Sequence, residues 1–331
     1  MKNDILRILD QHRGEFVSGS TLSEMLGVSR TAVWKQINAL RTSGYAIESV
    51  SRRGHRLLES PSDLGTYEIG QFIEESHFLK EGIFLETVDS TNAEAKRIAT
   101  DANFEERLPL IVIARDQNAG RGRLGRAWTS ESDSGIWCTL LMKPALPPEA
   151  AAPFTLIAAA AMCEAIESET GLDVGIKWPN DLIASGKKLC GILTELGAET
   201  DRIHYLVIGI GVNVSQTSFP GELAEKATSI QIETGLEIIN RLNILKAFVE
   251  RFEIYYNLFV NQKEISAVIA YNRKKSVTVN REVVIGAGQG EAIAYAEQID
   301  ESGNLIVRHG DGRRETIYYG EVSVRGINGY V

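Results

Sequence analysis

A short segment rich in glycine and arginine is the first place in this chain where chemistry can be expected. Residues 120–126 have the sequence Gly-Arg-Gly-Arg-Leu-Gly-Arg. Glycine allows positive φ angles and a close approach of a ligand to the backbone. Arginine carries a permanent charge on a planar group that pairs with phosphate and carboxylate. Because the apolar run 110–114 predicts a buried strand just before it, we interpret 120–126 as a basic loop that closes over an anion.

Two nucleotide-binding motifs and a plain basic turn are the alternatives for this loop. The glycine spacing formally matches the dinucleotide fingerprint, but that motif has to open a helix. Here a polar turn over 127–130 and a strand over 135–142 are expected instead. The loop also lacks the Gly-Lys-Ser/Thr ending of the phosphate-binding P-loop, and a solvated hairpin needs only one or two glycines. We favour a ligand-binding loop, although it does not identify the ligand by itself.

Three adjacent polar residues form a second candidate site. Ser90, Thr91 and Asn92 lie between a predicted strand over 83–88 and a predicted helix over 93–99. Thr91 and Glu94 have the spacing of a capping box, so helix capping is the simple explanation. Capping uses one hydroxyl, however. Three side chains that both donate and accept hydrogen bonds would suit a neutral polar ligand such as a ureido ring.

Further candidates lie at the ends of predicted strands. The motif Lys-Trp-Pro-Asn-Asp spans 177–181, and Lys188 opens a strand that we expect over 188–195. Residues 209–213 alternate glycine with branched side chains, which indicates a strand that something approaches closely. Asn180 and Asp181 offer oxygen ligands that suit Mg²⁺, or they shape the turn.

The N-terminal part of the chain predicts DNA binding. Residues 1–60 carry nine Lys and Arg against six Asp and Glu, so this segment is +3 within a chain of net charge -9. Predicted helices over 20–26 and 30–41 flank a glycine turn, as in a helix-turn-helix, and the second helix contains no acidic residue. A hairpin with a basic tip at 51–54 follows as a wing. The alternative is a helical dimerisation module. The candidate DNA contacts are Ser29, Arg30, Thr31, Lys35, Gln36, Arg52 and Arg53.

Composition narrows the class of protein. The 331 residues are 44% hydrophobic and 24% charged, which is ordinary for a globular protein of two or three domains. We expect a cytoplasmic protein with no membrane association, since no apolar run of about 18 residues occurs and the first residues lack a signal peptide's apolar stretch. The three cysteines lack zinc-site spacing, so reduced thiols and no structural metal are expected. Residues 60–76 are expected to be a linking segment, and the strands predicted from 276 onward a small antiparallel barrel.

Taken together and in this order, the motifs resemble those of the biotin protein ligases. The resemblance rests on 90–92, 120–126, 177–181, 188–193 and 209–213. With the winged helix it extends over almost the whole chain, as in the bifunctional form that is both ligase and repressor of the biotin operon. It implies an α+β chain: a winged helix-turn-helix over 1–62, a catalytic domain over 63–272 with a mixed sheet and helices like the class II tRNA synthetases, and an SH3-like barrel over 273–331.

The resemblance also implies a reaction and its partners. Biotin and ATP, with Mg²⁺, would form biotinyl-5′-AMP, and a lysine of a biotin carboxyl carrier protein, in acetyl-CoA carboxylase and other biotin enzymes, would accept the biotinyl group. The free loop at 120–126 would be disordered and would become ordered around the adenylate, forming a surface for a homodimer. The adenylate would then be the corepressor for a palindromic operator.

Site residues follow from the resemblance position by position. Lys188 and Arg123 would be catalytic, and Asp181 would be a metal ligand. The biotin site would comprise Ser90, Thr91, Asn92, Gln117, Gly120, Arg121, Gly122, Arg123, Lys188 and Gly191. The ATP and adenylate site would comprise Arg121, Arg123, Trp128, Asn180, Lys188, Asn213 and Arg325.

Two other functions are compatible with parts of this pattern. A lipoate ligase also forms an acyl adenylate, but it ordinarily lacks the Gly-Arg loop and the N-terminal module. A repressor that binds biotin without catalysis would not need Lys188, Arg123 and Asn180. The residue that covers the adenine stays open between Phe219 and the segment 227–229, because some relatives place a tryptophan there.

Overall fold

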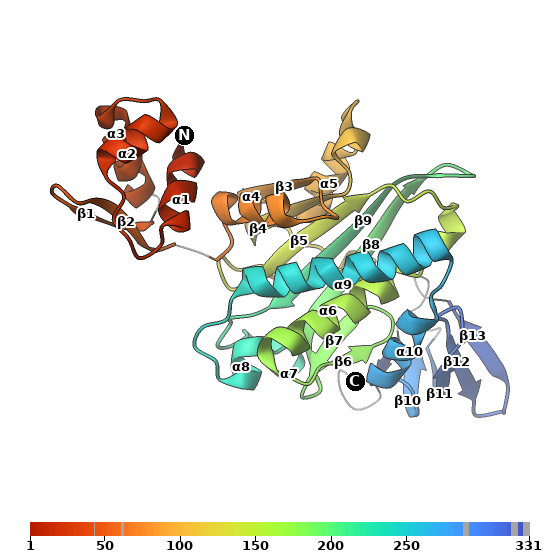
Figure 1. Ribbon diagram of the computed structural model, residues 1–331. Helices are drawn as coiled ribbons and strands as arrows, with labels where there is room; N and C mark the ends of the chain where they lie inside the picture. The colour runs from red at the N-terminus through yellow and green to blue at the C-terminus, as the bar shows by residue number, and fades with distance from the viewer. Residues whose placement is uncertain (43, 61–62, 287–290, 319–323, 327–331) are drawn as a thin grey trace. The chain divides into compact units, whose positions relative to one another are not determined.

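The chain divides into two units, Met1–Gln71 and Phe72–Val331 (Figure 1). The computed structural model describes residues 1–42, 44–60, 63–286, 291–318 and 324–326, the last without the side chains of Arg325 and Gly326. The three domain ranges expected from the sequence stay predictions.

The first unit is a winged helix-turn-helix, as predicted. Its core consists of apolar side chains of the three helices, Leu22, Val33 and Ile37 among them, and of the two strands. Ser18 accepts the Thr21 N–H at 3.0 Å at the start of the second helix. The elements are α1 (Lys2–Gln11), α2 (Gly19–Leu26), α3 (Arg30–Thr42), β1 (Ala46–Val50) and β2 (Gly54–Glu59).

A glycine ties the wing to the helices. Val17 exchanges two backbone hydrogen bonds with His55, at 2.9 and 2.8 Å. Gly54 has φ 115°, and a Cβ added there would lie 2.1 Å from the carbonyl oxygen of Val17. Only glycine therefore lets the wing strand lie this close to the chain that enters α2.

The segment expected to be a linker contains a helix, so that prediction was wrong. Helix α4 spans Thr66–Glu75. Its residue Tyr67 is buried in the core of the first unit, where the phenol donates to Asp10 at 3.5 Å. Leu64, Ile69 and Phe72 are buried as well. Burial of these apolar side chains explains why the segment forms a helix, although its Ser-Pro-Ser start suggested a linker.

A seven-stranded mixed sheet forms the centre of the second unit, as predicted. Its strand order is β3-β4-β5-β9-β8-β7-β6. The β3 and β4 strands are parallel and the other neighbours are antiparallel. The strands are β3 (Glu81–Val88), β4 (Leu110–Gln117), β5 (Gly135–Met142), β6 (Gly175–Lys177), β7 (Asp181–Ala184), β8 (Lys187–Ala198) and β9 (Ile203–Asn213).

Two long helices cover one face of this sheet. Helices α6 (Phe154–Thr170) and α9 (Arg241–Gln262) pack side by side across the strands (Figure 1). By length and composition alone the stretch Pro148–Thr170 could cross a bilayer, with a mean hydropathy of 1.4. In the fold 67% of its most apolar 18-residue window is buried, and α6 is a core helix that packs against the sheet and α9.

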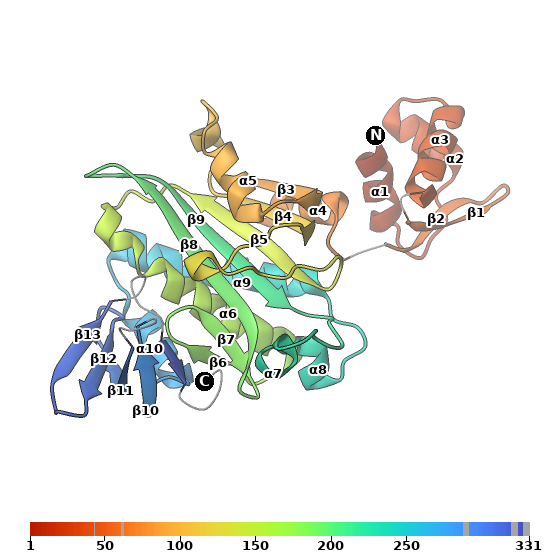
Figure 2. The ribbon, with the colours of Figure 1, turned by 180° about the vertical axis from the view of Figure 1, so that it is seen from behind.

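The opposite face carries a shorter helix (Figure 2). Helix α5 (Thr91–Ile98) packs Ala95 and Ile98 against Leu110, Leu141 and neighbouring apolar side chains. It leaves the glycine-containing parts of β8 and β9 accessible to other side chains on this face. The remaining helices are η1 (Phe104–Arg107), η2 (Arg123–Gly125), η3 (Pro148–Ala151), α7 (Leu223–Lys226), α8 (Ile230–Thr234) and α10 (Ser266–Lys275).

The C-terminal part forms the expected SH3-like antiparallel sheet. Its order is β13-β12-β11-β10-β14. Trp178, at the end of β6, joins it to the central sheet: the backbone N–H donates to Thr278 Oγ1 at 3.0 Å, and the indole N–H donates to the Gly303 carbonyl at 2.9 Å. The strands are β10 (Arg281–Ile285), β11 (Ala292–Ile299), β12 (Leu305–His309), β13 (Arg314–Ile317) and β14 (Val324–Gly326).

Candidate active site

The polar triplet at the start of α5 belongs to a hydrogen-bond network rather than to a helix cap. Ser90 occupies the N-cap position but makes no side-chain capping bond. Thr91 donates from its backbone N–H and its hydroxyl to Gln117 Oε1, at 2.8 and 3.1 Å. Gln117 in turn donates to the Ser130 hydroxyl at 2.7 Å. All three members of the triplet are buried, so the capping box does not account for them.

The protein's own hydrogen bonds determine which way the Asn92 amide faces. Its Nδ2 donates to Glu195 Oε2 at 2.7 Å and to the Leu193 carbonyl at 3.4 Å. The Thr139 hydroxyl donates to its Oδ1 at 2.7 Å. Since both amide protons have partners, the Asn92 oxygen is the atom with hydrogen-bonding capacity left.

Glu195 holds this arrangement in its ionised form. Burial acts to raise the pKa of its carboxyl, but hydrogen bonds from Lys96 and Asn92 outweigh burial and keep the pKa below its usual value. Lys96 Nζ lies 2.8 Å from Glu195 Oε1. An ionised carboxylate accepts hydrogen bonds only, and the Asn92 amide must therefore turn its NH₂ group toward it.

The alternating glycines admit side chains of the site itself. A Cβ added to Gly209 would lie 2.0 Å from Asn92 Oδ1, and one on Gly211 would lie 2.6 Å from the Trp128 indole. A Cβ on Gly191 would lie 2.9 Å from the same indole. The close approach predicted from the sequence is therefore made by Asn92 and Trp128.

The Gly-Arg loop folds back on itself next to Trp128. The Trp128 N–H donates to the Gly120 carbonyl at 2.9 Å, and the Gly122 N–H donates to the Arg126 carbonyl at 2.7 Å. A Cβ on Gly120 would lie 2.4 Å from the Trp128 carbonyl oxygen. Between these bonds a turn of 3-10 helix points the half-buried Arg123 inward, where its Nη1 donates to Asn180 Oδ1 at 2.8 Å.

Cations gather around one carboxylate at the ends of β6, β7 and β8. Lys188 Nζ lies 2.7 Å from Asp181 Oδ1 and 5.1 Å from the centroid of the Trp128 ring. Burial lowers the pKa of Lys177 to about 8, and Lys188 and Arg126 act in the same direction against the opposing charge of Asp181. Burial also lowers the pKa of Arg123, although a guanidinium stays charged. The cluster is arranged to receive an anion.

Two cavities meet at this cluster. A small cavity is lined by the polar triplet, Gln117 and Gly191. A larger hollow next to it is lined by Lys177, Asp181, Asn213 and Phe219. The residues that line both are Gly122, Arg123, Trp128, Asn180 and Lys188.

Most of the predicted ligand residues therefore lie together, with some exceptions. Asn213 lines only the larger hollow and donates to the Thr228 carbonyl at 2.9 Å. Gly120 packs beneath Trp128 and is not among the residues that line either cavity. The side chain of Arg325 lies outside the described residues.

Three residues of the site had no predicted role. Lys177 stands in the Lys-Trp-Pro-Asn-Asp motif, and its single charged side chain at the end of a buried strand was the available signal. Glu195, an acid at the end of the strand expected over 188–195, offered a weaker signal. Thr139 lies inside an apolar strand, and its fully buried hydroxyl gave none.

The predicted DNA contacts occupy different surfaces of the first unit. Arg30, Thr31 and Lys35 are exposed on α3. Gln36 is half-buried, and at about 100° per residue it points to another side of the helix. The Ser29 hydroxyl accepts the Ala32 N–H at 3.2 Å.

The wing contributes the other two predicted contacts. Arg52 is exposed at its tip. The Arg53 guanidinium lies 4.2 Å from the centroid of the Phe16 ring, so this side chain packs along the wing as well as facing solvent.

Comparison with known proteins gives a match for the N-terminal, the central and the C-terminal part of the chain. Residues 84–213 match the biotin/lipoate A/B protein ligase family, 2–56 match a helix-turn-helix domain, and 278–325 match the biotin protein ligase C-terminal domain. A bifunctional ligase/repressor BirA of Bacillus spizizenii is 35% identical over 98% of both chains. The protein of that name from Escherichia coli is 30% identical over 94% of both.

A solved structure supports the same assignment for the second unit. The biotin protein ligase from Aquifex aeolicus, in complex with biotin and ATP, superimposes with a TM-score of 0.63 at 28% identity. The match covers 75% of this chain and 99% of that one. The chain therefore belongs to the biotin protein ligase family, in the bifunctional form that carries an N-terminal helix-turn-helix repressor domain.

Proposed function

We propose that this protein converts biotin and ATP to biotinyl-5′-AMP and transfers the biotinyl group to a lysine of a biotin carboxyl carrier protein. The observation that carries this proposal is the position of Arg123 and Lys188, which line both cavities where the two meet. An acid in the smaller cavity and a nucleotide in the larger hollow would bring a carboxylate and an α-phosphate together there. The similarity to a ligase solved with biotin and ATP supports the same arrangement.

The smaller cavity has the hydrogen-bonding polarity that a ureido ring requires. Asn92 presents an oxygen that would accept a ureido N–H. Gln117 donates one N–H to Ser130 and has a second to offer to the ureido oxygen. Ser90 adds a buried hydroxyl. Lipoate has no N–H in its ring, so it could not use the remaining acceptor capacity of the Asn92 oxygen, and we propose biotin rather than lipoate as the substrate.

Adenylation would then depend on position and charge. A biotin carboxylate oxygen attacks the α-phosphorus, the bond to the β-phosphate breaks, and pyrophosphate leaves with the electron pair. Lys188 and Arg123 would stabilise the negative charge that grows on the α-phosphoryl oxygens. Asp181 and Asn180 hold these two cations in place at 2.7 and 2.8 Å.

Transfer uses the same bound adenylate. The amine of a carrier lysine attacks the acyl carbon, the C–O bond to AMP breaks, and the amine loses a proton. The Gly-Arg loop would screen the mixed anhydride from water until the carrier arrives. Arg121, exposed on this loop and lining the smaller cavity, would add a further contact to the adenylate.

Mg²⁺ fits this site only as a companion of the nucleotide. Asp181 is engaged by Lys188 at 2.7 Å and by Asn180 at 3.2 Å. No group of three or more His, Cys, Asp or Glu side chains that could hold a metal occurs in the part of the chain that the structure describes. Mg²⁺ commonly binds through substrate phosphates and water with few protein ligands. We therefore assign Mg²⁺ to the ATP phosphates and Asp181 to the orientation of Lys188.

The regulatory half of the proposal concerns DNA. The helix-turn-helix unit would bind a palindromic operator of biotin genes as a homodimer, with biotinyl-5′-AMP as corepressor. Contact of the adenylate with the loop 120–126 would couple the two activities through dimerisation. A cytoplasmic location stays part of this proposal.

Carrier modification tests the enzymatic half. Incubation with biotin, Mg-ATP and a purified carrier domain should add one biotinyl group to the carrier, as measured by mass spectrometry, and release one pyrophosphate per turnover. Lipoate supplied in place of biotin should give no product. Modification by lipoate alone would identify a lipoate ligase instead, and binding of biotin without modification would identify a sensor.

Sedimentation tests the regulatory half. The full chain is titrated with biotinyl-5′-AMP, and its self-association is measured with biotin alone as the control. We expect the adenylate to promote dimers more strongly than biotin. Equal self-association in both titrations would contradict the corepressor role and leave the ligase reaction untouched.

A further inference from the structure

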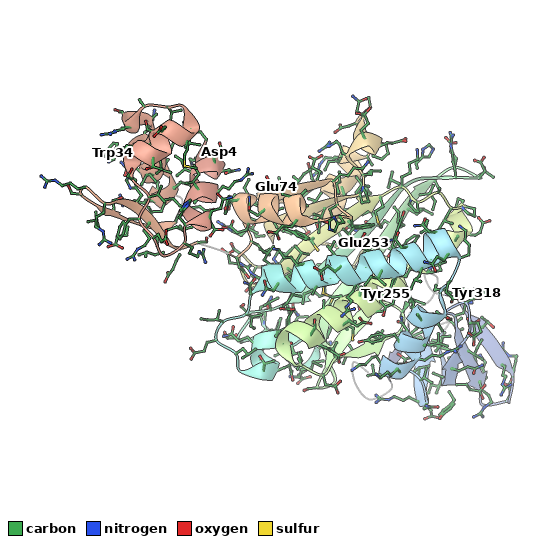
Figure 3. All side chains as sticks on the ribbon, viewed as in Figure 1. Asp4, Trp34, Glu74, Glu253, Tyr255 and Tyr318 are labelled. Atoms are coloured by element: carbon green, nitrogen blue, oxygen red, sulfur yellow. The ribbon has the colours of Figure 1, made fainter. Side chains whose placement is uncertain are left out.

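A tryptophan on the second helix of the helix-turn-helix projects into solvent. Trp34 is 61% exposed on α3 (Figure 3). A tryptophan side chain can bury roughly 150–250 Å², so leaving it exposed forgoes a large apolar contact. The apolar residues of the same helix that face the core, Val33, Ile37 and Leu40, are fully buried. Trp34 is therefore outside the core, and its neighbours decide what it meets.

Those neighbours are cationic and polar. At about 100° per residue, Trp34 shares a side of α3 with Arg30, Thr31 and Asn38, and Lys35 lies on the adjoining side. Arg30, Thr31 and Lys35 are exposed. The helix contains no acidic residue. The negative charge of the rest of the chain is spread over a large surface, whereas duplex nucleic acid carries one negative charge on about every 1.7 Å of its axis. A polyanion gains most, which points to nucleic acid in duplex form.

We propose that Trp34 contacts the 5-methyl group of a thymine in the major groove and so gives the protein part of its operator specificity. This inference rests on the proposed DNA-binding function and extends it to a base. The major groove admits a helix, and the thymine methyl is the apolar group that its base edges present. Arg30 and Lys35 on either side would bind phosphates and fix the register. The indole then meets an apolar target instead of water.

Replacement of thymine by deoxyuridine tests the contact, because it removes that methyl group and leaves base pairing intact. Duplexes bound by the full chain in the presence of biotin and Mg-ATP are selected from a random-sequence pool. Each thymine of the selected site is then replaced singly by deoxyuridine. Loss of one buried methyl group should weaken binding about fourfold at one position of each half-site, with little change elsewhere.

The variant Trp34→Ala identifies the side chain responsible. It should bind with no deoxyuridine effect at that position while its other preferences persist. If its affinity is too low at 0.1 M salt, the scan is repeated at lower salt, where phosphate contacts strengthen. Met25→Ala is the matched control, since Met25 is a large apolar residue, 56% exposed, on the neighbouring α2, and this variant should retain the wild-type deoxyuridine profile.

Each other outcome has a defined meaning. A flat scan for the wild-type chain, or an unchanged profile in Trp34→Ala, overturns the thymine contact. A change in oligomeric state of Trp34→Ala without DNA assigns the side chain to a protein interface and also overturns it. Failure of the wild-type chain to enrich any sequence contradicts the proposed DNA-binding function itself.

Discussion

The catalytic pocket and the DNA-binding surface use the same kinds of side chain in opposite ways. In the pocket, Arg123 is half-buried and held by Asn180, and Lys188 is held by Asp181. On the helix-turn-helix, Arg30 and Lys35 are exposed to solvent. One set is oriented before a ligand arrives, whereas the other is oriented by the ligand.

This difference predicts two kinds of response to substitution. Water screens charges only weakly in a partly desolvated site. A fixed cation there stabilises the charge that forms in the transition state, so its loss should greatly lower kcat. Exposed cations contribute in parallel and are screened by salt, so the loss of one should be modest and salt-dependent. The following substitutions test that contrast.

The largest effect is expected for Lys188→Ala. Loss of the ammonium group beside the α-phosphate should lower kcat for adenylation by about 100- to 1000-fold, measured as biotin-dependent pyrophosphate release. Lys187→Ala is the control, because Lys187 donates to the Ala224 carbonyl at 2.9 Å and lines neither cavity. Equal rates for the two variants would remove Lys188 from the mechanism.

The second-largest effect is expected for Gly209→Ala, which adds a methyl group inside the site. Gly209→Ala places a Cβ 2.0 Å from Asn92 Oδ1, so the amide must move and lose its bonds. We expect the KM for biotin to rise roughly 10- to 100-fold with the KM for ATP unchanged. Gly310→Ala, where a Cβ meets nothing within 4 Å, should leave both constants alone. A rise in both KM values for Gly209→Ala would mean that the sheet itself is disturbed.

The pH dependence of ATP use should report Lys177. Its pKa is lowered from 10.5 to about 8 in the folded chain. Below pH 8 the ammonium is charged and attracts the triphosphate, and above pH 8 it is neutral, so kcat/KM for ATP should fall as pH rises through about 8. Lys177→Arg keeps the charge and should remove this decline.

The same shift has a consequence for stability, with a defined sign. A folded-state pKa below the unfolded value means that folding disfavours the charged lysine. This cost is fully present below pH 8 and disappears as pH rises toward 10.5. Lys177→Met should therefore raise the melting temperature more at pH 7 than at pH 10. A pH-independent difference would argue against the lowered pKa.

The smallest effect is expected on the DNA side. Arg52→Ala removes one exposed charge at the wing tip and should reduce the slope of log affinity against log salt by about one. Fluorescence anisotropy with the selected duplex measures this slope between about 0.05 and 0.3 M salt. Arg313→Ala, which removes an exposed charge from the C-terminal sheet, should leave the slope unchanged.

The local patterns of this sequence predicted the elements well and their partners poorly. Strands, the helix-turn-helix and the terminal sheet follow from apolar periodicity and glycine turns. The sequence around Thr91 and Glu94 is compatible both with a capping box and with the hydrogen-bond network that the structure contains. A local pattern cannot reveal that the Thr91 hydroxyl donates to Gln117 at the end of β4.

The same limit explains the missed helix and the missed acid. Helix α4 is ordered partly by Tyr67, which reaches Asp10 across 57 residues of sequence. Glu195 meets Asn92 across 103 residues. Alternating glycines revealed that β9 is approached closely, because a missing side chain is visible in a sequence, but what fills the space comes from elsewhere in the chain.

Trp178 has a consequence for how such enzymes diversify. Its indole N–H reaches the Gly303 carbonyl, while the residues that follow it, Asn180 and Asp181, hold the catalytic cations. A chimaera that borrowed about its last sixty residues from a distant relative would keep this bond only if that relative places a backbone carbonyl at the position of Gly303. Exchange of terminal modules should therefore succeed only between parents that share both ends of this bond.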